Sequence, residues 1–564
     1  MTYAPPLDDL AAAMAAIGAD RLAGTERFAE ASAETVAAVL AEAGRLAAER
    51  LAPLQRVGDL NPARLENGVV RTSPGFAEAY RAIAEGGWIG ISADPAHGGM
   101  GLPLTVGSAV SEMMSSACMA LWLNPLLTQG QIEALEAHAP DWIRAVCLPR
   151  LVSGEWTGTM NLTEPQAGSD VGALRATAEP NGDGTYAVSG QKIFISWGDH
   201  DMAQNICHLV LARLPGAAPG TRGISLFLVP KIIFDAEGRL GAANSVRAIG
   251  LEHKLGLHGS PTCVMEYDRA TGWLIGPEHG GMACMFTMMN AARLAVGVEG
   301  VASAEAALQA ALAHARERRQ GRTPRGDGRG PIAEHADVRR MIAQMRARTS
   351  AARAICLDCA LSLDMARAAA NAEERARWTA RAALLTPIAK AFGTETGCEV
   401  ADLAIQIHGG MGYVEETGVA QFWRDVRVTT IYEGTNGIQA MDLVGRKLSD
   451  GGAAARALIA EMRAGAGSPL ARALDALDQA TGWMLSAEPT DRNAGAVPYL
   501  RAFALCLGVH YLHAAARARP AEPARAALAR IGEERLLPQV AALCAEACAG
   551  AGSLYAEEAE PLFA

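Results

Sequence analysis

The feature that most constrains the fold is a change in sequence texture near residue 157 that reverses near residue 281. Residues 7–52 and 104–127 are rich in Ala, Leu, Glu and Arg, with apolar residues every three or four positions, which predicts helices. Residues 157–267 instead contain short β-branched or aromatic runs, such as "GQKIFISW" and "GISLFLVP", separated by Gly, Pro, Asp and Asn. This spacing is typical of an antiparallel β sandwich or barrel.

Helical patterns return after residue 281 and have the lengths and spacing of a helix bundle. The predicted helices lie at residues 282–318, 333–371, 373–408 and 435–447, and a last helical region follows the turn at 448–455. A chain of 564 residues also exceeds one hydrophobic core. We therefore predict an α+β protein with a helical domain at residues 1–156, a β domain at 157–275, a bundle at 276–447 and an additional helical domain at 448–564. A common reason for a β module between helical halves is a ligand held where the domains meet.

Composition excludes several classes of protein. The formal net charge of -11 gives no sign of the basic face that nucleic-acid binders carry. The chain shows no signal-peptide pattern and no run of 18 apolar residues, so we expect a cytoplasmic protein without a membrane span. The odd number of cysteines, eleven, fits reduced thiols. Cys356 and Cys359 form a CxxC without a second pair, which we interpret as buried helical thiols rather than a metal site.

Two motifs in the β region carry small polar or aromatic side chains on exposed turns or strand ends. "MNLTEPQAGSD" (160–170) offers Thr163 and Ser169, which suit the polar edge of a planar ligand or a thioester oxygen. "GQKIFISWGDHD" (190–201) places Phe194, Ser196 and Trp197 at a strand end, where an aromatic ring could stack on a flat cofactor. Taken alone, the first motif is better explained by an ordinary Pro/Gly turn, and the second is slightly better explained by a half-buried edge strand.

Three further motifs stand at helix ends and are also ambiguous. In "QIHGGMG" (406–412), paired glycines could admit phosphate oxygens beside Gln406, or could simply end a helix. In "ARERRQG", Arg318 could clamp a pyrophosphate or solvate a surface. In "IYEGTNGIQ" (431–439), Glu433 could be a working base, or could stabilise the N-terminus of the next helix through its dipole.

These motifs, with "KLGLHGSPT", occur in the order and approximate spacing of the acyl-CoA dehydrogenase family, which the chain resembles over roughly residues 80–446. The resemblance implies an acyl-CoA dehydrogenase-like fold, with an N-terminal helical domain, a middle β barrel and a C-terminal four-helix bundle, here followed by an extra helical domain. It implies FAD held between barrel and bundle, and oxidation of an acyl-CoA thioester to the trans-2-enoyl-CoA.

The resemblance also implies roles for individual residues. Glu433 resembles the base that removes the α-proton, and its backbone amide would help to stabilise the enolate oxygen. A dry site should raise the pKa of this carboxyl and make it a better acceptor. The residues implied to bind FAD are Met160, Leu162, Thr163, Phe194, Ser196, Arg318, Gln406, Gly409, Gly410 and Thr435. Those implied to contact the substrate are Ser169, Arg293 and Gly434.

Several positions differ from the common acyl-CoA dehydrogenase pattern, and they indicate which subgroup of the family the chain resembles. Asn436-Gly437 replaces the small residue and glutamine of common short- and medium-chain members, and a long helical region follows Lys447. These features and the block "LEHKLGLHGSPTCVMEYDRATGWLIG" resemble a long bacterial subgroup of the family. That subgroup implies 3-methylthiopropionyl-CoA, from dimethylsulfoniopropionate degradation, or a short- or medium-chain acyl-CoA as substrate.

The resemblance further implies an electron-transfer flavoprotein as electron acceptor and at least a homodimer. Two alternatives remain open at this point. An acyl-CoA oxidase would use the same base with oxygen as acceptor. A non-catalytic CoA-thioester or flavin-binding protein would need no carboxylate at Glu433, so the presence of that residue counts against it.

Overall fold

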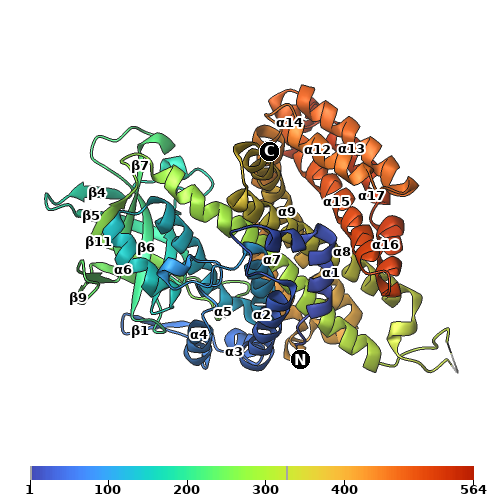
Figure 1. Ribbon diagram of the computed structural model, residues 1–564, viewed down its shortest axis with the longest axis horizontal. Coiled ribbons are helices and arrows are strands. Elements are labelled where there is room, and N and C mark those ends of the chain that lie inside the picture. The colour runs from blue at the N-terminus through green and yellow to red at the C-terminus, as the bar shows by residue number, and fades with distance from the viewer. Residues whose placement is uncertain (1–2, 326–327) are drawn as a thin grey trace. The chain divides into compact units, whose positions relative to one another are not determined.

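The structure is a computed structural model that describes residues 3–325 and 328–564 (Figure 1). Its chain divides into two compact units. The unit that we call the barrel unit comprises Glu42–Leu102 and Ala117–Ala292. The unit that we call the bundle unit comprises Met1–Ala41, Pro103–Ser116 and Arg293–Ala564.

The barrel unit is built on a seven-stranded sheet. Its strands are β3 (Trp156–Asn161), β4 (Thr177–Pro180), β5 (Tyr186–Ser196), β6 (Asn205–Arg213), β7 (Ile224–Pro230), β10 (Val246–Leu251) and β11 (Thr262–Ile275). Two hairpins, β1 (Arg64–Glu66) with β2 (Val69–Arg71) and β8 (Ile232–Phe234) with β9 (Leu240–Ala243), form separate two-stranded sheets. In the large sheet, β11 pairs with β5 and β7, β4 joins β5 to β6, and β6 pairs with β7. These five strands close into a ring, which confirms the predicted barrel.

The strand directions differ in part from the expected antiparallel arrangement. Most pairs are antiparallel, but β3–β6 and β4–β6 are parallel, so the sheet is mixed. The expectation of a purely antiparallel sheet was therefore wrong. Strand directions depend on which strands become neighbours, and parallel neighbours need a crossover that hydrophobic periodicity does not reveal. Strands β6 and β7 are buried along almost their whole length, which explains why they read as continuous apolar runs rather than as alternating patterns.

Two helices, α5 (Leu104–His138) and α7 (Gly281–Glu317), run from one unit into the other. By length and composition alone both could cross a membrane, although we expected no such segment. In the structure, however, 94% of the most apolar window of α5 and 56% of that of α7 are buried inside the protein. The burial of α5 is that of a core helix. The remaining helices before residue 160 are α1 (Leu7–Ile17), α2 (Ala33–Leu46), α3 (Leu54–Leu60), α4 (Phe76–Glu85) and α6 (Asp141–Val152).

The centre of the bundle unit is a close crossing between α7 and α9 (Ala372–His408). A Cβ atom added to Gly300 would lie 2.3 Å from the carbonyl oxygen of Gly393, and one added to Gly393 would lie 2.4 Å from that of Gly297. Glycine is therefore needed where the two backbones touch. Helix α8 (Ala336–Ala368) packs along α9, and α10 (Val419–Val426) and α11 (Asn436–Asp442) follow it in the chain. Cys356 and Cys359 are buried in α8, as predicted.

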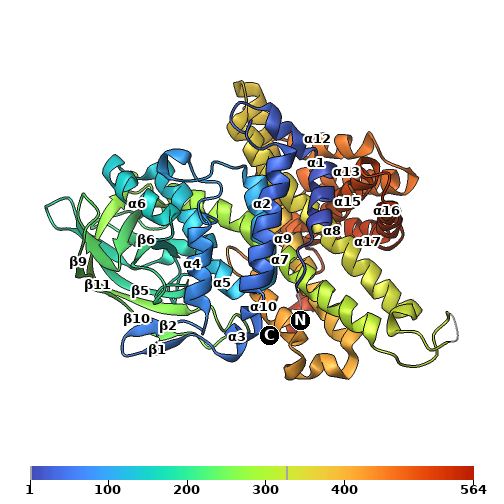
Figure 2. The same cartoon turned by 60° about the horizontal axis from the view of Figure 1, so that its bottom comes forward.

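The predicted C-terminal helical region is present and belongs to the bundle unit. Its helices are α12 (Ala453–Arg463), α13 (Ser468–Ser486), α14 (Pro489–Ala494), α15 (Ala496–Ala518), α16 (Pro523–Arg535) and α17 (Pro538–Ala547). The long helix α15 packs against both α1 and α8, and the shorter helices surround it (Figure 2). Tyr499, Phe503 and Leu507 of α15 are fully buried. This region is therefore an integral layer of the unit rather than a loose tail.

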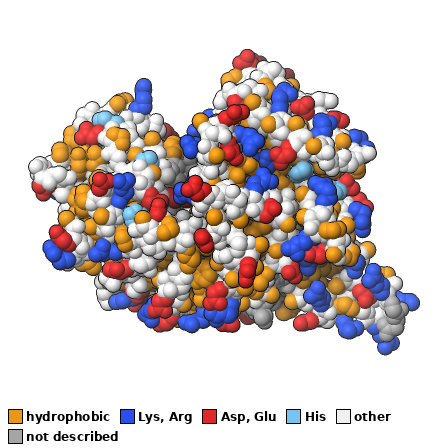
Figure 3. Space-filling view, in the orientation of Figure 1, with side chains coloured by type: hydrophobic (Ala, Val, Ile, Leu, Met, Phe, Trp, Pro, Cys, Tyr) orange, Lys and Arg blue, Asp and Glu red, His pale blue; other side chains and the backbone are white. Residues whose placement is uncertain are grey.

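A buried ion cluster joins three helices of the bundle unit. Arg353 of α8, only 1% exposed, binds Glu112 of α5 at 2.6 Å and Glu305 of α7 at 2.7 Å. Burial opposes charge on the guanidinium, but the two carboxylates raise the pKa of Arg353. On the surface, by contrast, Lys and Arg side chains intermingle with Asp and Glu over most of the face shown in Figure 3.

Candidate active site

In the barrel unit, the predicted cofactor residues cluster where β3 ends and β5 ends. Met160 lies in β3, and Leu162 and Thr163 follow it directly. The amide of Ile193 in β5 donates a hydrogen bond of 2.9 Å to the carbonyl oxygen of Thr163. The turn that follows β3 is therefore fastened beside the end of β5, which brings two separate sequence motifs together.

A buried ion pair, which sequence reasoning missed, supports this junction. The ammonium of Lys192 binds the Glu164 carboxylate at 2.8 Å and the carbonyl oxygen of Leu162 at 3.0 Å. Glu164 also accepts backbone hydrogen bonds from Arg175 and Ala176, and with Lys192 these lower the pKa of Glu164 despite its burial. Burial lowers the pKa of Lys192 to about 8. The ion pair and its hydrogen bonds therefore tie the "LTEPQAGSD" turn to β5 and to the backbone of Arg175 and Ala176.

The two aromatic residues at the end of β5 have different environments. Phe194 has a positive φ of 59° and leaves 59% of its surface exposed. Trp197, also at positive φ, is fully buried against Phe76 with ring centroids 6.5 Å apart. Such φ values are uncommon for bulky residues and often mark functional positions. An exposed ring beside the partly exposed hydroxyl-bearing residue Ser196 fits the face of a flat cofactor; Ser169 is exposed on the neighbouring turn.

In the bundle unit, the predicted pyrophosphate residues meet at one end of the α7–α9 pair. His314 of α7 stacks on His408 of α9 with ring centroids 4.2 Å apart, which joins the two helix ends. Arg318 directly follows α7, and its guanidinium is exposed. Gln406, the last residue but two of α9, is exposed as well.

The adjoining glycines leave a bare stretch of backbone. Gly409 has a φ of 61°, and among the described residues no atom lies within 4 Å of a Cβ built on Gly409 or Gly410. The Gly409 N–H is already used, since it donates to the Gln406 carbonyl oxygen, but the exposed side chains of Gln406 and Arg318 offer an amide and a guanidinium, a donor set that fits phosphate oxygens. Within the bundle unit, the residues at this helix end therefore fit a pyrophosphate group such as that of FAD, and within the barrel unit the exposed ring of Phe194 separately fits a flat ring such as that of the flavin.

The loop around Glu433 contains a helix cap, but the cap is not the Glu433 carboxylate. Helix α11 begins at Asn436, and the Thr435 hydroxyl accepts a hydrogen bond of 3.3 Å from the amide of Ile438. Thr435 is thus the cap. Glu433 itself has a positive φ of 56°, and within residues 3–325 and 328–564 no hydrogen bond to its carboxylate is found. Gln439 donates hydrogen bonds of 3.2 Å and 3.1 Å to the carbonyl oxygens of Glu433 and Gly434, which stabilises this strained bend.

Burial makes Glu433 a stronger base than a free glutamate. It raises the pKa of Glu433 to about 7, although the nearby cations Arg293 and Lys390 act in the opposite direction. Arg293 is 7% exposed, and its Nε lies 3.5 Å from the carbonyl oxygen of Glu433. The structure therefore brings Arg293 and Gly434, both predicted substrate residues, to the loop that carries the predicted base.

Sequence reasoning missed two charged members of this cluster. Lys390 of α9 is fully buried and donates to Asn436 Oδ1 at 2.9 Å. Glu299 of α7 is 1% exposed and accepts a hydrogen bond from the Tyr432 hydroxyl. The signal that could have found them is a lone charged residue within an apolar helical run, in "VGVEG" and "IAKAFG". A lone charge in such a run must find a buried partner.

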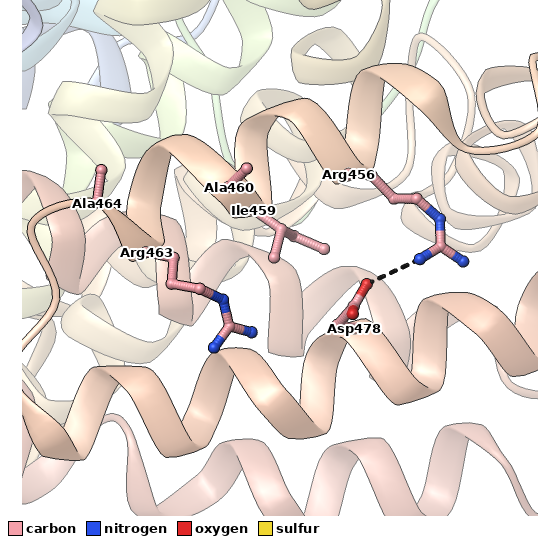
Figure 4. Close-up of a pocket in the computed structure, with 6 residues that line it drawn as sticks. All are labelled: Arg456, Ile459, Ala460, Arg463, Ala464 and Asp478. Atoms are coloured by element: carbon pink, nitrogen blue, oxygen red, sulfur yellow. Dashed lines mark hydrogen bonds and ion pairs between the residues drawn. The ribbon is translucent and has the colours of Figure 1, made fainter.

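Two pockets of the bundle unit lie at other residues. One cavity of about 410 Å³ between α12 and α13 is lined by Arg456, Ile459, Ala460, Arg463, Ala464 and Asp478 (Figure 4). Its charged side chains neutralise one another, since Arg456 pairs with Asp478 at 3.1 Å and Arg463 with Asp475 at 2.7 Å. A second cavity of about 280 Å³ adjoins Asp358, Arg381, Glu461 and Tyr511. Neither pocket is lined by a residue with an expected role in acyl-CoA oxidation.

Comparison with known proteins agrees with the fold. Family models match residues 33–155 (Acyl-CoA dehydrogenase, N-terminal domain), 159–270 (middle domain) and 279–448 (C-terminal domain). The chain is similar to 3-methylmercaptopropionyl-CoA dehydrogenase of Ruegeria pomeroyi, with 46% identity over 89% of this chain and 88% of the relative. It is also 41% identical to a butyryl-CoA dehydrogenase of Syntrophomonas wolfei over 62% of this chain and 59% of that relative.

Two further similarities concern the electron acceptor and the fold. A subunit of the caffeyl-CoA reductase-Etf complex of Acetobacterium woodii is 31% identical over 60% of this chain and 79% of its own length, so the family includes relatives that work with an electron-transferring flavoprotein. The solved structure of Caenorhabditis elegans ACDH-11 in complex with C11-CoA aligns with a TM-score of 0.80 at 22% identity, over 95% of this chain and 92% of that one. The family models match most of the chain, and the alignment with the Ruegeria relative covers most of both proteins. The chain therefore belongs to the acyl-CoA dehydrogenase family of FAD-dependent oxidoreductases.

Proposed function

We propose that this enzyme removes two hydrogens from an acyl-CoA thioester to give the trans-2-enoyl-CoA, with Glu433 as the catalytic base. The observation that carries the proposal is a half-buried carboxyl whose pKa desolvation raises to about 7, while Thr435 caps the next helix in its place. A general base is most effective when its pKa lies near the working pH. General base catalysis contributes roughly 10² to 10⁴ in rate.

The proposed reaction assigns a separate role to each group of residues in the site. Glu433 takes the α-proton as the α C–H bond breaks, and its backbone amide stabilises the thioester oxygen as negative charge develops there. Arg293 and Gln439 hold the bend that aims the carboxylate. Bound FAD would supply the acceptor for the hydride that leaves the β-carbon. The residues proposed to hold it are Met160, Leu162, Thr163, Phe194, Ser196, Arg318, Gln406, Gly409, Gly410 and Thr435, and Ser169 is proposed to lie beside the CoA arm.

For the substrate we propose 3-methylthiopropionyl-CoA, with short- and medium-chain acyl-CoAs as the second candidate. The name of the Ruegeria relative supports the first, and the name of the Syntrophomonas relative supports the second. We expect kcat/KM for 3-methylthiopropionyl-CoA to exceed that for butyryl-CoA and octanoyl-CoA in an assay with an artificial electron acceptor. A clear preference for octanoyl-CoA would contradict the first choice while leaving the reaction class intact.

We propose an electron-transferring flavoprotein as acceptor, a cytoplasmic homodimer as the working form, and the domain boundaries 1–156, 157–275, 276–447 and 448–564. The family's association with such flavoproteins supports the acceptor. An oxidase would instead pass the electrons to oxygen. Hydrogen peroxide formed in air at the rate of substrate consumption would identify an oxidase.

The acidity of Glu433 predicts the pH dependence of the reaction. Below about pH 7 the carboxyl is mostly protonated, and a protonated carboxyl is too weak a base to accept the α-proton. We therefore expect kcat/KM to fall about tenfold for each pH unit below that value and to level off above it, because this ratio reports groups of the free enzyme. A profile measured with a saturating artificial acceptor tests this. A profile that stays flat down to pH 5 would contradict a raised pKa at the base.

A further inference from the structure

This inference rests on the proposed function of Glu433. We infer that Lys390 and Glu299 are positioning residues that control whether the Glu433 carboxyl is ionised. Lys390 acts as a buried cation, and Glu299 acts as a second buried acid. Neither residue has an assigned role in the reaction. The pair also gives a function to Asn436, the residue at which the chain departs from common family members.

The glycine contact between α7 and α9 is what brings the two charges together. Gly300, one residue after Glu299, meets the backbone of Gly393, which is three residues after Lys390. Because no Cβ separates the helices there, charged groups on facing turns come to lie close to one another. The crossing therefore places a carboxyl and an ammonium in the same buried interior, since Glu299 is 1% exposed and Lys390 is fully buried.

Lys390 is fastened to the loop that carries the base. Its Nζ donates to Asn436 Oδ1 at 2.9 Å, and Asn436 Nδ2 donates to Thr394 Oγ1 at 3.1 Å. Asn436 is the first residue of α11, three residues after Glu433. The carboxyl groups that face this ammonium are Glu433, Glu299 and Glu395, while the cation Arg293 opposes it.

Glu299 is fastened to the same loop from the other helix. The Tyr432 hydroxyl donates to its Oε2, and its Oε1 is buried without a hydrogen-bond partner among the described residues. An ionised carboxylate in such a place is unfavourable, whereas a protonated one leaves less charge uncompensated. The charged groups that face Glu299 are Glu433 and Lys390.

The acid–base properties agree with this arrangement. Burial raises the pKa of Glu299 to about 8, with Glu433 acting in the same direction and Lys390 against it. Burial lowers the pKa of Lys390 to about 8, with Glu433 and Glu299 acting against it. Two carboxyls that interact in this way release their protons in two coupled steps, which belong to the pair. The positive charge of Lys390 favours the release of both protons, and one of the two protons belongs to the carboxyl of Glu299.

Two substitutions with different expected signatures test the inference in the FAD-bound enzyme. In Lys390→Met the cation is lost, so both carboxyl titrations should move to higher pH. If the pKa of the base rises by one unit, flavin reduction at pH values below that pKa should become about tenfold slower. In Glu299→Gln the more alkaline titration should disappear, and Glu433 should titrate in a single step at a pH no higher than in the unchanged enzyme. The carboxyl stretch in infrared difference spectra across a pH series measures both effects without turnover.

Conservative variants separate this role from damage to the fold. Lys390→Arg keeps the positive charge and should keep the titration near its original pH. Should Lys390→Met fail to fold, Lys390→Gln replaces it, because glutamine also removes the charge but can still donate a hydrogen bond to Asn436. Unchanged carboxyl titrations in both Lys390→Met and Glu299→Gln, or an upward shift in both, would overturn the inference. Failure of the proposed function is distinguishable, because it shows as flavin reduction by acyl-CoA that persists in Glu433→Gln.

Discussion

Replacement of Glu433 by glutamine is expected to lower the rate of flavin reduction by acyl-CoA by roughly 10² to 10⁴, the usual contribution of a general base. Glutamine has almost the same size but cannot accept the α-proton. Thr435 caps α11 and Gln439 binds only backbone oxygens of the bend, so the local fold does not depend on the Glu433 carboxylate. Rapid-mixing measurement of flavin bleaching under anaerobic conditions gives the rate directly.

The matched control is Glu416→Gln. Glu416 is an exposed glutamate of the short helical turn before α10, and its loss should leave the rate unchanged. The Glu433→Gln protein should keep the yellow colour of bound FAD and should still bind the thioester. A variant that keeps full turnover would show that another group removes the proton.

Replacement of Arg353 by methionine is expected to lower the free energy of unfolding by about 3–5 kcal/mol, as expected when one partner of a buried ion cluster is removed. The loss would leave Glu112 and Glu305, which are 2% and 5% exposed, as neighbouring acids without their shared cation. Burial already raises the pKa of Glu112, with the charge of Glu305 acting in the same direction. The denaturant midpoint of the bundle unit, followed by circular dichroism, measures the effect.

Arg340→Met on the same helix provides the comparison. Arg340 pairs with Asp337 at 2.7 Å, but its side chain is 40% exposed, and such surface pairs contribute about 0–1 kcal/mol. Equal midpoints for Arg353→Met and Arg340→Met would show that the buried cluster does not stabilise the unit. If Arg353→Met cannot be purified folded, Glu305→Gln, which keeps the size and one hydrogen bond, should show a smaller loss in the same direction.

The predictions that succeeded from sequence concern local patterns. Three- and four-residue periodicity identified the long helices of the bundle and the helical region after residue 448, because each helix needs one apolar side to face the core. Alternation of short apolar runs with Gly and Pro identified the strands of the barrel. The order of the six motifs identified the family, because order along the chain is itself information in the sequence.

The candidate site was only partly predictable. The motif "IYEGTNGIQ" pointed to Glu433, but the same sequence is compatible with a glutamate that caps a helix and with one that acts as a base. The hydrogen bond from Ile438 to Thr435 separates the two possibilities, because it assigns the capping role to the hydroxyl. Lys192 and Glu164 stand 28 residues apart, and their ion pair forms because the turn after β3 is fastened beside β5, which spacing in the sequence does not reveal.

By itself, the sequence determined which segments are helical or extended, which family the chain resembles and which acid stands at the critical bend. Tertiary structure alone decided the parallel strand pairs of the barrel, the glycine contact between α7 and α9, and the burial that raises the pKa of Glu433 to about 7. The reason is physical. Secondary structure follows from interactions between residues near one another in the chain, whereas desolvation and the pairing of Lys390 with Asn436 exist only after distant segments have packed together.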